Sequence, residues 1–337
     1  MFFSVLVDYW NLVLYDGVMD DQFELIEADE YTKKRSLSFV PTYFVICALP
    51  LRATKDKVLT YSRSYNQYSL RLISVRGKGL PGGRLARLLL SLFTTEAVLQ
   101  KNTSPSQRII LEYRSIKELM KKMGIERCNH QKEVSELLDK FAATLITFDI
   151  SESRKYEQLQ QKLIPEDVSV DRPYINLTAI SNVPFFDQFT RLEVSEEKGR
   201  RGVAIFMKIV LSQQFVEMAQ RNSVPVDYDV YKSINSSLGK DLYVWLVYRN
   251  NSNLPKSGLH ISRKNLVDQF MSDEGKTGYE PVHYQRIIEE IKEIKKKYYK
   301  DLNVHIPLKG DGITLFKSPS VIKSNDIRYV PLMNNYF

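Results

Sequence analysis

The sequence predicts an α+β protein in which two similar units follow one another along the chain. Its 337 residues are too many for one typical domain and suit two. Some segments place apolar residues at helical spacing, and others are short β-branched or aromatic runs bounded by polar turns. Each half shows the order helix, short strand, helix, helix and paired strands, which is typical of a winged helix. We therefore expect two tandem winged-helix domains.

The first unit is predicted to open with short strands, at residues 42–50, 57–62 and 67–75. A helix is predicted over 84–101, because its leucines and Phe93 form a broad apolar stripe. Four polar residues are expected on the opposite, exposed side of this helix: Arg84, Arg87, Ser91 and Thr94.

The rest of the first unit follows the same order. A strand is predicted over 108–113, and Ser115 with Glu118 forms a capping box for a helix that stops at Gly124. A second helix is predicted over 129–143, with an apolar face. The unit ends with two paired strands and a long polar loop or extended wing between them, at residues 145–150, 174–180 and 151–172.

The second unit repeats this pattern. Residues 241–249 have almost no polar face and predict a buried helix. A short strand at 260–262 leads into a helix capped by Ser262, and a long helix is predicted over 281–299. Two strands around the turn at 309–312, KGDG, predict a hairpin that closes the unit.

The charge distribution is uneven. The chain has 48 Lys and Arg against 40 Asp and Glu, and its first 32 residues contain eight acids and no Lys or Arg. A basic body behind an acidic N-terminal segment indicates a polyanionic partner. The alternative is an ordinary soluble protein with a basic pI.

Several other classes of protein fit poorly. The glycines at 77 and 82 have Walker A spacing, but Gly83 and Arg84 follow where Lys and Ser or Thr are needed. A metal-dependent nickase needs close histidines, and His260 and His283 are separated by a whole helix. Two cysteines without a CxxC motif indicate neither zinc nor a disulfide framework, and no apolar stretch approaches 18 residues. We expect no cofactor, no metal, no membrane span and no enzymatic activity.

The start of the long helix 281–299 carries the strongest binding signal. His283, Gln285 and Arg286 are expected to be exposed there, with Tyr279 just before them. In a winged helix such residues enter the major groove, where Arg can bond guanine and Gln adenine. The preceding helix and the hairpin turn add basic residues for phosphate: Arg263, Lys264 and Lys309. The alternative is a solvated helix stabilised by i,i+4 ion pairs.

The first unit shows a similar but weaker signal. Polar and basic residues gather at the start of its last helix and on the helix before it: Arg127, Asn129, His130, Lys132, Lys117, Lys121 and Lys122. These side chains could follow phosphates. An exposed basic face without a ligand is the alternative.

Several segments resemble the RepA-type plasmid replication initiators, the iteron-binding Rep proteins. GLPGGRLARLLLSLFTTEAV, residues 79–98, is similar to the family's Leu-Pro and glycine turn and its Arg-Leu-Leu-Leu helix ending in Thr-Glu-Ala-Val. Further similar segments are SIKELMKKMGI (115–125), the stretch 209–234, SLGKDLYVWLVYR (237–249), HISRKNLVDQF (260–270) and GITLFKSPSVI (312–322). The chain departs from the family pattern at Gly82, where an aromatic residue is usual, and at ERCNHQK (126–132), which replaces a Gly-rich segment.

The resemblance implies a division of the chain into an acidic segment, a first winged-helix domain for dimerisation and auxiliary DNA contact, a connecting strand and helix, a second winged-helix domain for origin recognition, and a tail: 1–40, 41–200, 201–222, 223–322 and 323–337. It implies binding of iterons in double-stranded DNA, opening of a plasmid origin, and recruitment of the host replication initiator and replicative helicase. It also implies autorepression with plasmid copy number control, and a homodimer in equilibrium with a DNA-binding monomer in the bacterial cytoplasm. A winged-helix transcriptional regulator without a direct replication role is the alternative.

Overall fold

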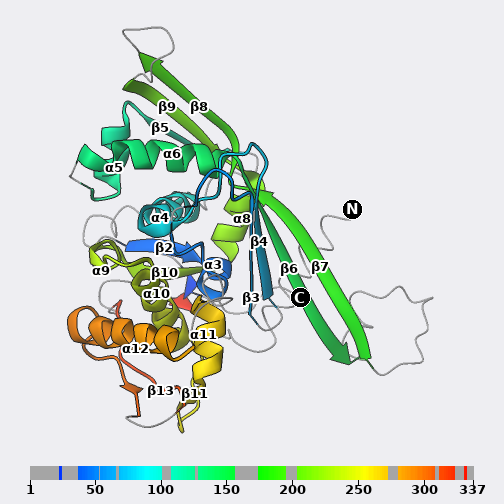
Figure 1. The fold of residues 1–337 in the computed structure, drawn as a ribbon, viewed down its shortest axis with the longest axis vertical. Helices are drawn as coiled ribbons and strands as arrows, with labels where there is room; N and C mark the ends of the chain where they lie inside the picture. Colours follow the sequence, from blue (N-terminus) through cyan, green and yellow to red (C-terminus); the bar gives the residue numbers. More distant parts are fainter. Residues whose placement is uncertain are drawn as a thin grey trace.

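The structure is a computed structural model of the whole chain. It describes residues 23–24, 37–52, 54–65, 68–100, 108–125, 128–155, 174–194, 203–271, 280–307, 311–322 and 330–331. Most of the acidic N-terminal segment lies outside these residues. The mixture of helices and antiparallel sheets confirms the α+β class (Figure 1).

The middle of the molecule joins distant parts of the chain. Strand β2 (Leu37–Pro41) pairs antiparallel with β10 (Ser223–Asp227), and the short helix α3 (Thr42–Ile46) follows β2. The prediction of a strand from residue 42 is therefore wrong. Every residue of α3 is buried, so its uninterrupted apolar run has no period that separates a strand from a buried helix.

Helix α4 (Gly83–Leu99) lies at the centre and confirms the predicted helix, but not its exposed face. Arg87, Ser91 and Thr94 are 2 %, 0 % and 0 % exposed, so their predicted exposure is wrong. The reason is that α4 packs on β2, α6 and α10 at once, which leaves no open side over most of its length. Ser91 Oγ hydrogen-bonds Ser38 Oγ on β2, and Thr94 Oγ1 donates to the Leu90 carbonyl 2.7 Å away.

The turn before α4 depends on close packing. A Cβ added to Gly82 would lie 2.3 Å from the Arg52 carbonyl oxygen. A side chain at this position therefore requires the 50–52 segment to move, which accounts physically for the glycine where the similar family has an aromatic residue.

The first unit continues from α4 through β5 (Ile110–Tyr113), α5 (Ile116–Lys122), a short 3-10 turn η1 (Cys128–His130) and α6 (Gln131–Ala142). The capping box of α5 is confirmed. Ser115 Oγ accepts from the Glu118 amide at 3.2 Å, and Glu118 Oε2 accepts from the Arg114 amide at 2.7 Å. The three-stranded sheet of this unit has the order β5-β9-β8, with β8 (Phe186–Val194) and β9 (Val203–Leu211).

A second sheet interrupts this unit. Strands β6 (Thr144–Lys155) and β7 (Tyr174–Pro184) pair as predicted, but they extend β3 (Thr60–Tyr65) and β4 (Tyr68–Ser74) in the order β3-β4-β6-β7. The sequence had predicted that they form the wing of the β5 sheet, and this prediction is wrong. The strands that complete the β5 sheet are β8 and β9, and β9, expected as a connecting strand, is the central strand of that sheet.

The second unit follows α8 (Gln213–Arg221), β10 and α9 (Tyr228–Ser233). It contains the buried helix α10 (Ser237–Asn251), β11 (Leu259–Ile261), α11 (Arg263–Met271), α12 (Glu280–Lys297), β12 (Val304–His305) and β13 (Ile313–Leu315). Its sheet has the order β11-β13-β12, which is the strand order of the first unit. Figure 1 shows the two sheets at opposite ends of the molecule, with α4 and the β2–β10 pair between them.

Gly312 is required where β13 begins. Its φ is +101°, and an added Cβ would lie 1.9 Å from the Ile261 carbonyl oxygen. The turn therefore holds the hairpin against β11 only with glycine at this position. A further short pair joins β1 (Phe23–Glu24) and β14 (Val330–Pro331). Within the described residues, no helix is both long and apolar enough to cross a membrane.

Candidate nucleic-acid interface

The starts of α11 and α12 are connected to the turn before β13. The Arg263 amide donates to Asp311 Oδ1 at 3.1 Å, and Arg263 Nε lies 3.7 Å from the same oxygen. The Arg263 guanidinium carbon lies 5.2 Å from the centre of the Tyr284 ring. Tyr284 Oη donates to the Gly312 carbonyl at 2.8 Å. Residues from three separate elements therefore form one cluster, the wing cluster: Arg263, Tyr284, Asp311 and Gly312.

Within the wing cluster, Arg263 is held by its neighbours. Its side chain is 34 % exposed, and both Asp311 and the Tyr284 ring contact it. Burial raises the pKa of Tyr284, so this hydroxyl stays protonated and donates. The cluster fixes how the hairpin turn sits against the first turn of α12.

Beside the wing cluster, polar side chains at the start of α12 face outward. Gln285 is exposed and its Nε2 donates to Glu289 Oε1 at 3.0 Å, while Arg286 is half-buried. Lys264 is exposed on α11. The structure therefore brings Arg263, Lys264, Gln285 and Arg286 to one region of the second unit.

The predicted exposure of His283 is wrong. Its side chain is 8 % exposed, and among the described residues its Nε2 has no hydrogen-bond partner. His283 precedes Ile287 by four residues and Ile291 by eight, so helix geometry places all three on the buried face. Tyr279, Lys309 and Arg127, also predicted to contact DNA, lie outside the described residues.

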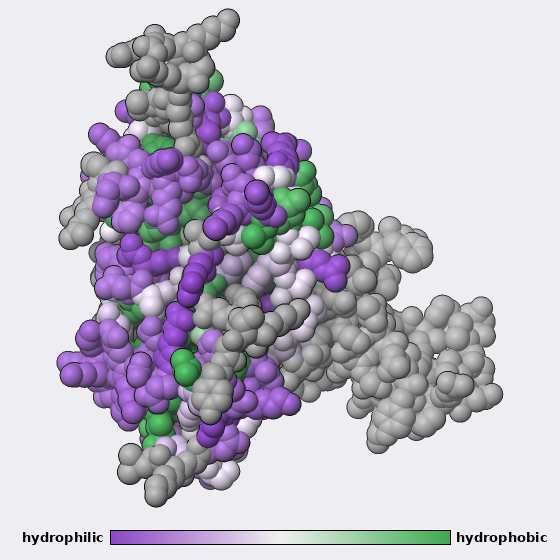
Figure 2. Space-filling model, viewed as in Figure 1, coloured by the Kyte–Doolittle hydropathy of each residue, from purple (hydrophilic) through white to green (hydrophobic). Residues whose placement is uncertain are grey.

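The first unit exposes its predicted cations on α5 and at the start of α6. The exposed residues are Lys117, Lys121, Asn129 and Lys132. His130 is half-buried, and its Nδ1 lies 3.2 Å from Glu133 Oε2. Lys122 Nζ lies 5.5 Å from the centre of the Tyr113 ring. Hydrophilic side chains cover much of the surface over these helices and over α12 (Figure 2).

Acidic residues lie along α6 from its first turn onward. Glu133 and Glu136 are exposed, and Asp139 Oδ1 lies 3.1 Å from Arg191 Nη1 of β8.

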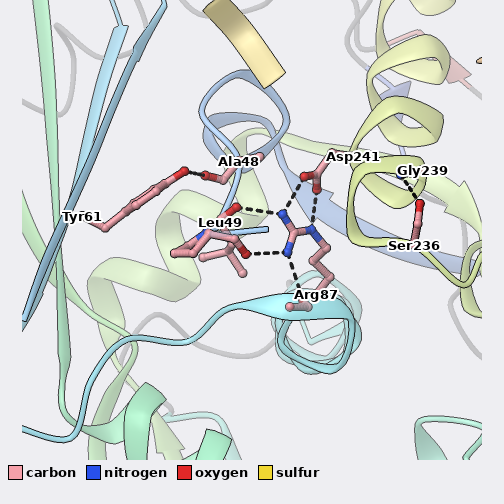
Figure 3. Close-up of polar contacts among 9 residues, drawn as sticks. Ala48, Leu49, Tyr61, Arg87, Ser236, Gly239 and Asp241 are labelled. Carbon is pink, nitrogen blue, oxygen red and sulfur yellow. Dashed lines mark hydrogen bonds and ion pairs between the residues drawn. The ribbon is translucent and has the colours of Figure 1, made fainter. Parts of the chain in front are cut away.

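A buried ion pair connects the two units (Figure 3). Arg87 Nε and Nη2 lie 2.6 Å from Asp241 Oδ1 and Oδ2, and the two side chains are 2 % and 7 % exposed. The guanidinium also donates to the carbonyls of Leu49, Pro50 and Gly83, at 2.7, 3.0 and 3.0 Å. Burial alone would lower the pKa of Arg87, but the Asp241 carboxylate raises it above its ordinary value. This pair fixes α4 against α10.

A second buried cation lies next to this pair. Lys240 is 0 % exposed, and its Nζ donates to the Tyr231 carbonyl. Burial and the neighbouring Arg84 and Arg87 lower its pKa to about 6, although Asp241 acts in the opposite direction. Burial and the two neighbouring arginines therefore favour the neutral form of Lys240 at the junction between the units.

No family model matches the chain, and no curated protein matches it significantly. Among solved structures, domains 2 and 3 of RctB are similar to it, with a TM-score of 0.48 and 12 % identity over 84 % of this chain and 99 % of that chain. A second structure of RctB domains 2–3 has a TM-score of 0.44 and 13 % identity over 81 % and 94 %. Since both TM-scores lie below 0.5, any functional assignment rests on this chain's own motifs and geometry.

Proposed function

We propose that the chain is a plasmid replication initiator of the RepA type that binds iterons in double-stranded origin DNA. In this proposal each unit is a winged helix, with α5 and α6, or α11 and α12, as the helix pair that meets DNA. The observation that carries it is a strand order that both units share, β5-β9-β8 in the first and β11-β13-β12 in the second. In each unit a pair of helices follows the first of these strands, α5 and α6 after β5, and α11 and α12 after β11. Of the segments similar to the RepA-type family, 115–125, 260–270 and 312–322 lie in or beside these elements, whereas 79–98 and 237–249 lie in the helices α4 and α10.

The second unit is the proposed base reader. Gln285 and Arg286 lie at the start of α12, where a recognition helix contacts base edges. A good bidentate contact from such a side chain contributes about 1–3 kcal/mol of discrimination. The wing cluster would hold the turn before β13 next to the adjoining DNA backbone.

Affinity in this proposal comes mainly from phosphate contacts. Lys264 on α11, and Lys117, Lys121 and Lys132 in the first unit, are exposed and available for them. Each phosphate neutralised changes the slope of log Kobs against log salt by about 0.9. Binding should therefore weaken steeply as salt rises.

The remaining steps of replication initiation would take place in the complex that assembles on the origin DNA. The protein would act without enzymatic activity or a cofactor, open the origin by binding several repeats, and recruit the host initiator and helicase. A homodimer would repress the protein's own gene and so limit plasmid copy number, while the monomer would bind iterons.

The direct test is footprinting of the purified protein on DNA that flanks its own gene, at about 150 mM salt. Several evenly spaced protected repeats, together with loss of replication when the gene is deleted from its plasmid, are the expected result. One protected palindrome and a plasmid that replicates without the gene would favour a winged-helix transcriptional regulator instead. Metal-dependent nicking of supercoiled origin DNA would contradict the non-enzymatic part of the proposal.

A further inference from the structure

A cleft of about 700 Å³ opens where the two units meet. Its lining combines the start of α4, the end of the α5 turn, η1 and the segment after α9, so both units contribute to it. Three of the lining side chains can carry positive charge: Arg84, His130 and Lys232. Figure 1 shows α5 and α9 on the same side of the molecule, with α4 between them.

Among the described residues of this junction cleft, carboxylates lie beside Lys232 and His130 but not beside Arg84. Lys232 Nζ lies 2.5 Å from Asp229 Oδ1, and His130 lies beside Glu133. Both carboxylates are 47 % or more exposed, and exposed pairs of this kind are weak enough to yield to a stronger ligand. Within the described residues, Arg84 has no carboxylate partner.

The backbone around the cleft adds to its positive potential. Helix α4 begins beside Arg84 and has no acidic residue in its first turn. Helix N-termini carry a partial positive charge. At the start of α10, beside Asn235, the Glu290 carboxylate lies close to Gly239 and offsets this charge.

The cleft is also open to solvent, so a group can enter it from outside. Arg84 and Lys232 are each half-exposed, so their charged ends reach solvent while their stems pack against the protein. An added Cβ on Gly124 would lie 2.9 Å from Lys232 Cδ, so the glycine leaves the space that this lysine occupies. The arrangement suits a tetrahedral anion held between an arginine and a lysine.

We infer that the junction cleft binds a phosphate group through Arg84 and Lys232, and that this phosphate belongs to the DNA backbone as it passes from one unit to the other. The choice of backbone phosphate rests on the proposed function, because a duplex contacted by both units must cross their junction. The phosphate chemistry itself rests only on the cleft.

The first arm of the test measures binding to a random-sequence duplex over a range of salt concentrations. Arg84→Gln and Lys232→Gln should each lower the magnitude of the slope of log Kobs against log salt by about 0.9, which is about five-fold weaker binding at 150 mM salt. Arg84→Lys should restore most of the wild-type slope. Arg71→Gln removes an exposed arginine on β4, away from the cleft, and should leave the slope unchanged.

The second arm uses inorganic phosphate alone and follows the thermal unfolding temperature of each variant. Phosphate should raise the Tm of the wild type and of Arg71→Gln, and should have a smaller effect on Arg84→Gln. Because Arg84 and Lys232 are half-exposed, their substitution should not itself lower the Tm measured without phosphate.

The two arms separate the possible failures. A phosphate effect that depends on Arg84, with unchanged salt slopes, would overturn the DNA backbone as source and assign the cleft to a free phosphate-bearing molecule. The same phosphate effect in a protein that binds no DNA would refute the proposed function but not the phosphate site. Unchanged slopes together with equal phosphate effects in all variants would overturn the inference entirely.

Discussion

The two units share a strand order but use their third helices differently. In the first unit, the outer side of α6 carries Glu133 and Glu136, and Arg191 of β8 pairs with Asp139. In the second unit, α12 opens with outward-facing Gln285 next to Arg286 and ends in three lysines. Both helices carry an acidic residue in the first turn, Glu133 in α6 and Glu280 in α12, so the proposed base reading by the second unit rests on the exposed Gln285 beside Arg286.

The insertion of β6 and β7 strengthens this contrast. In the second unit the chain passes from α12 to β12 within a few residues, whereas in the first unit β6 and β7 separate α6 from β8. The inserted strands complete a four-stranded sheet with β3 and β4. The first unit therefore contains an additional sheet. The Arg87–Asp241 pair fixes α4 of this unit against α10 of the second unit.

The largest expected effect comes from breaking that connection. Asp241→Asn removes the carboxylate from a guanidinium that is 2 % exposed, leaving Arg87 as a buried charge without a counter-ion. We expect the free energy of unfolding to fall by about 3–5 kcal/mol. Urea denaturation of the wild type and of Asp241→Asn measures this difference in the free energy of unfolding.

A matched control uses an exposed pair. Lys297→Gln breaks the contact between Lys297 Nζ and Glu293 Oε1, 2.7 Å apart on the surface of α12, and should leave stability unchanged within error. If Asp241→Asn behaved like this control, the two units would not depend on the buried pair.

The second prediction separates base reading from phosphate binding. Arg286→Ala should cost about 1–3 kcal/mol in binding to the specific repeat and much less on a random duplex, because the guanidinium is proposed to contact a base edge. Competition binding with the two duplexes at one salt concentration measures the difference. Equal losses on both duplexes would mean that Arg286 contacts only phosphate.

The first unit supplies the comparison for that experiment. The double substitution Lys117→Gln and Lys121→Gln removes two exposed cations from α5. It should weaken binding to both duplexes to a similar extent and lower the salt slope by up to about 1.8. A selective loss on the specific repeat would instead give the first unit a reading role.

The third prediction concerns pH. The pKa of Lys240 is lowered to about 6 in the folded state, so between pH 6 and its ordinary value the unfolded chain binds more protons. Stability should therefore rise with pH in this window, by up to about 1.4 kcal/mol per pH unit from this group. Urea unfolding of wild type and Lys240→Met at pH 7, 8 and 9 isolates the contribution, and parallel profiles would contradict it.

The smallest effect is expected in the wing cluster. Tyr284→Phe removes the hydroxyl that donates to the Gly312 carbonyl at 2.8 Å but keeps the ring beside Arg263. We expect about 1 kcal/mol lower stability, together with weaker specific binding, because the hairpin turn loses a contact to α12. Wild-type specific binding despite the lower stability would show that the turn's position does not matter for recognition.

Much of the fold followed from the sequence. The helices at 84–101, 129–143, 241–249 and 281–299, the Ser115 cap and the pairing of 145–150 with 174–180 were all predicted from period and capping residues. Periodicity could not identify which neighbours a helix has. Arg87 looked exposed because it is polar, but α10 supplies Asp241 from 154 residues away.

The candidate site was predictable only in part. Gln285 and Lys264 are exposed as expected, whereas His283 lies on the face of Ile287 and is buried. The wing of the first unit was assigned to 151–172 because a long polar stretch separates two matching strands. Which of several hairpins completes the β5 sheet is decided by long-range pairing, and no local pattern carries that information.

The most direct test of the central claim, that the two units occupy neighbouring grooves of one duplex, is affinity cleavage. In a Cys128→Ser background, Glu136→Cys on α6 and Glu289→Cys on α12 would each carry a tethered iron chelate, since both glutamates are exposed. Two cleavage centres on one repeat, separated by about one helical turn of 10–10.5 bp, are the predicted result. A single shared centre, or cleavage from α12 alone, would contradict the tandem arrangement.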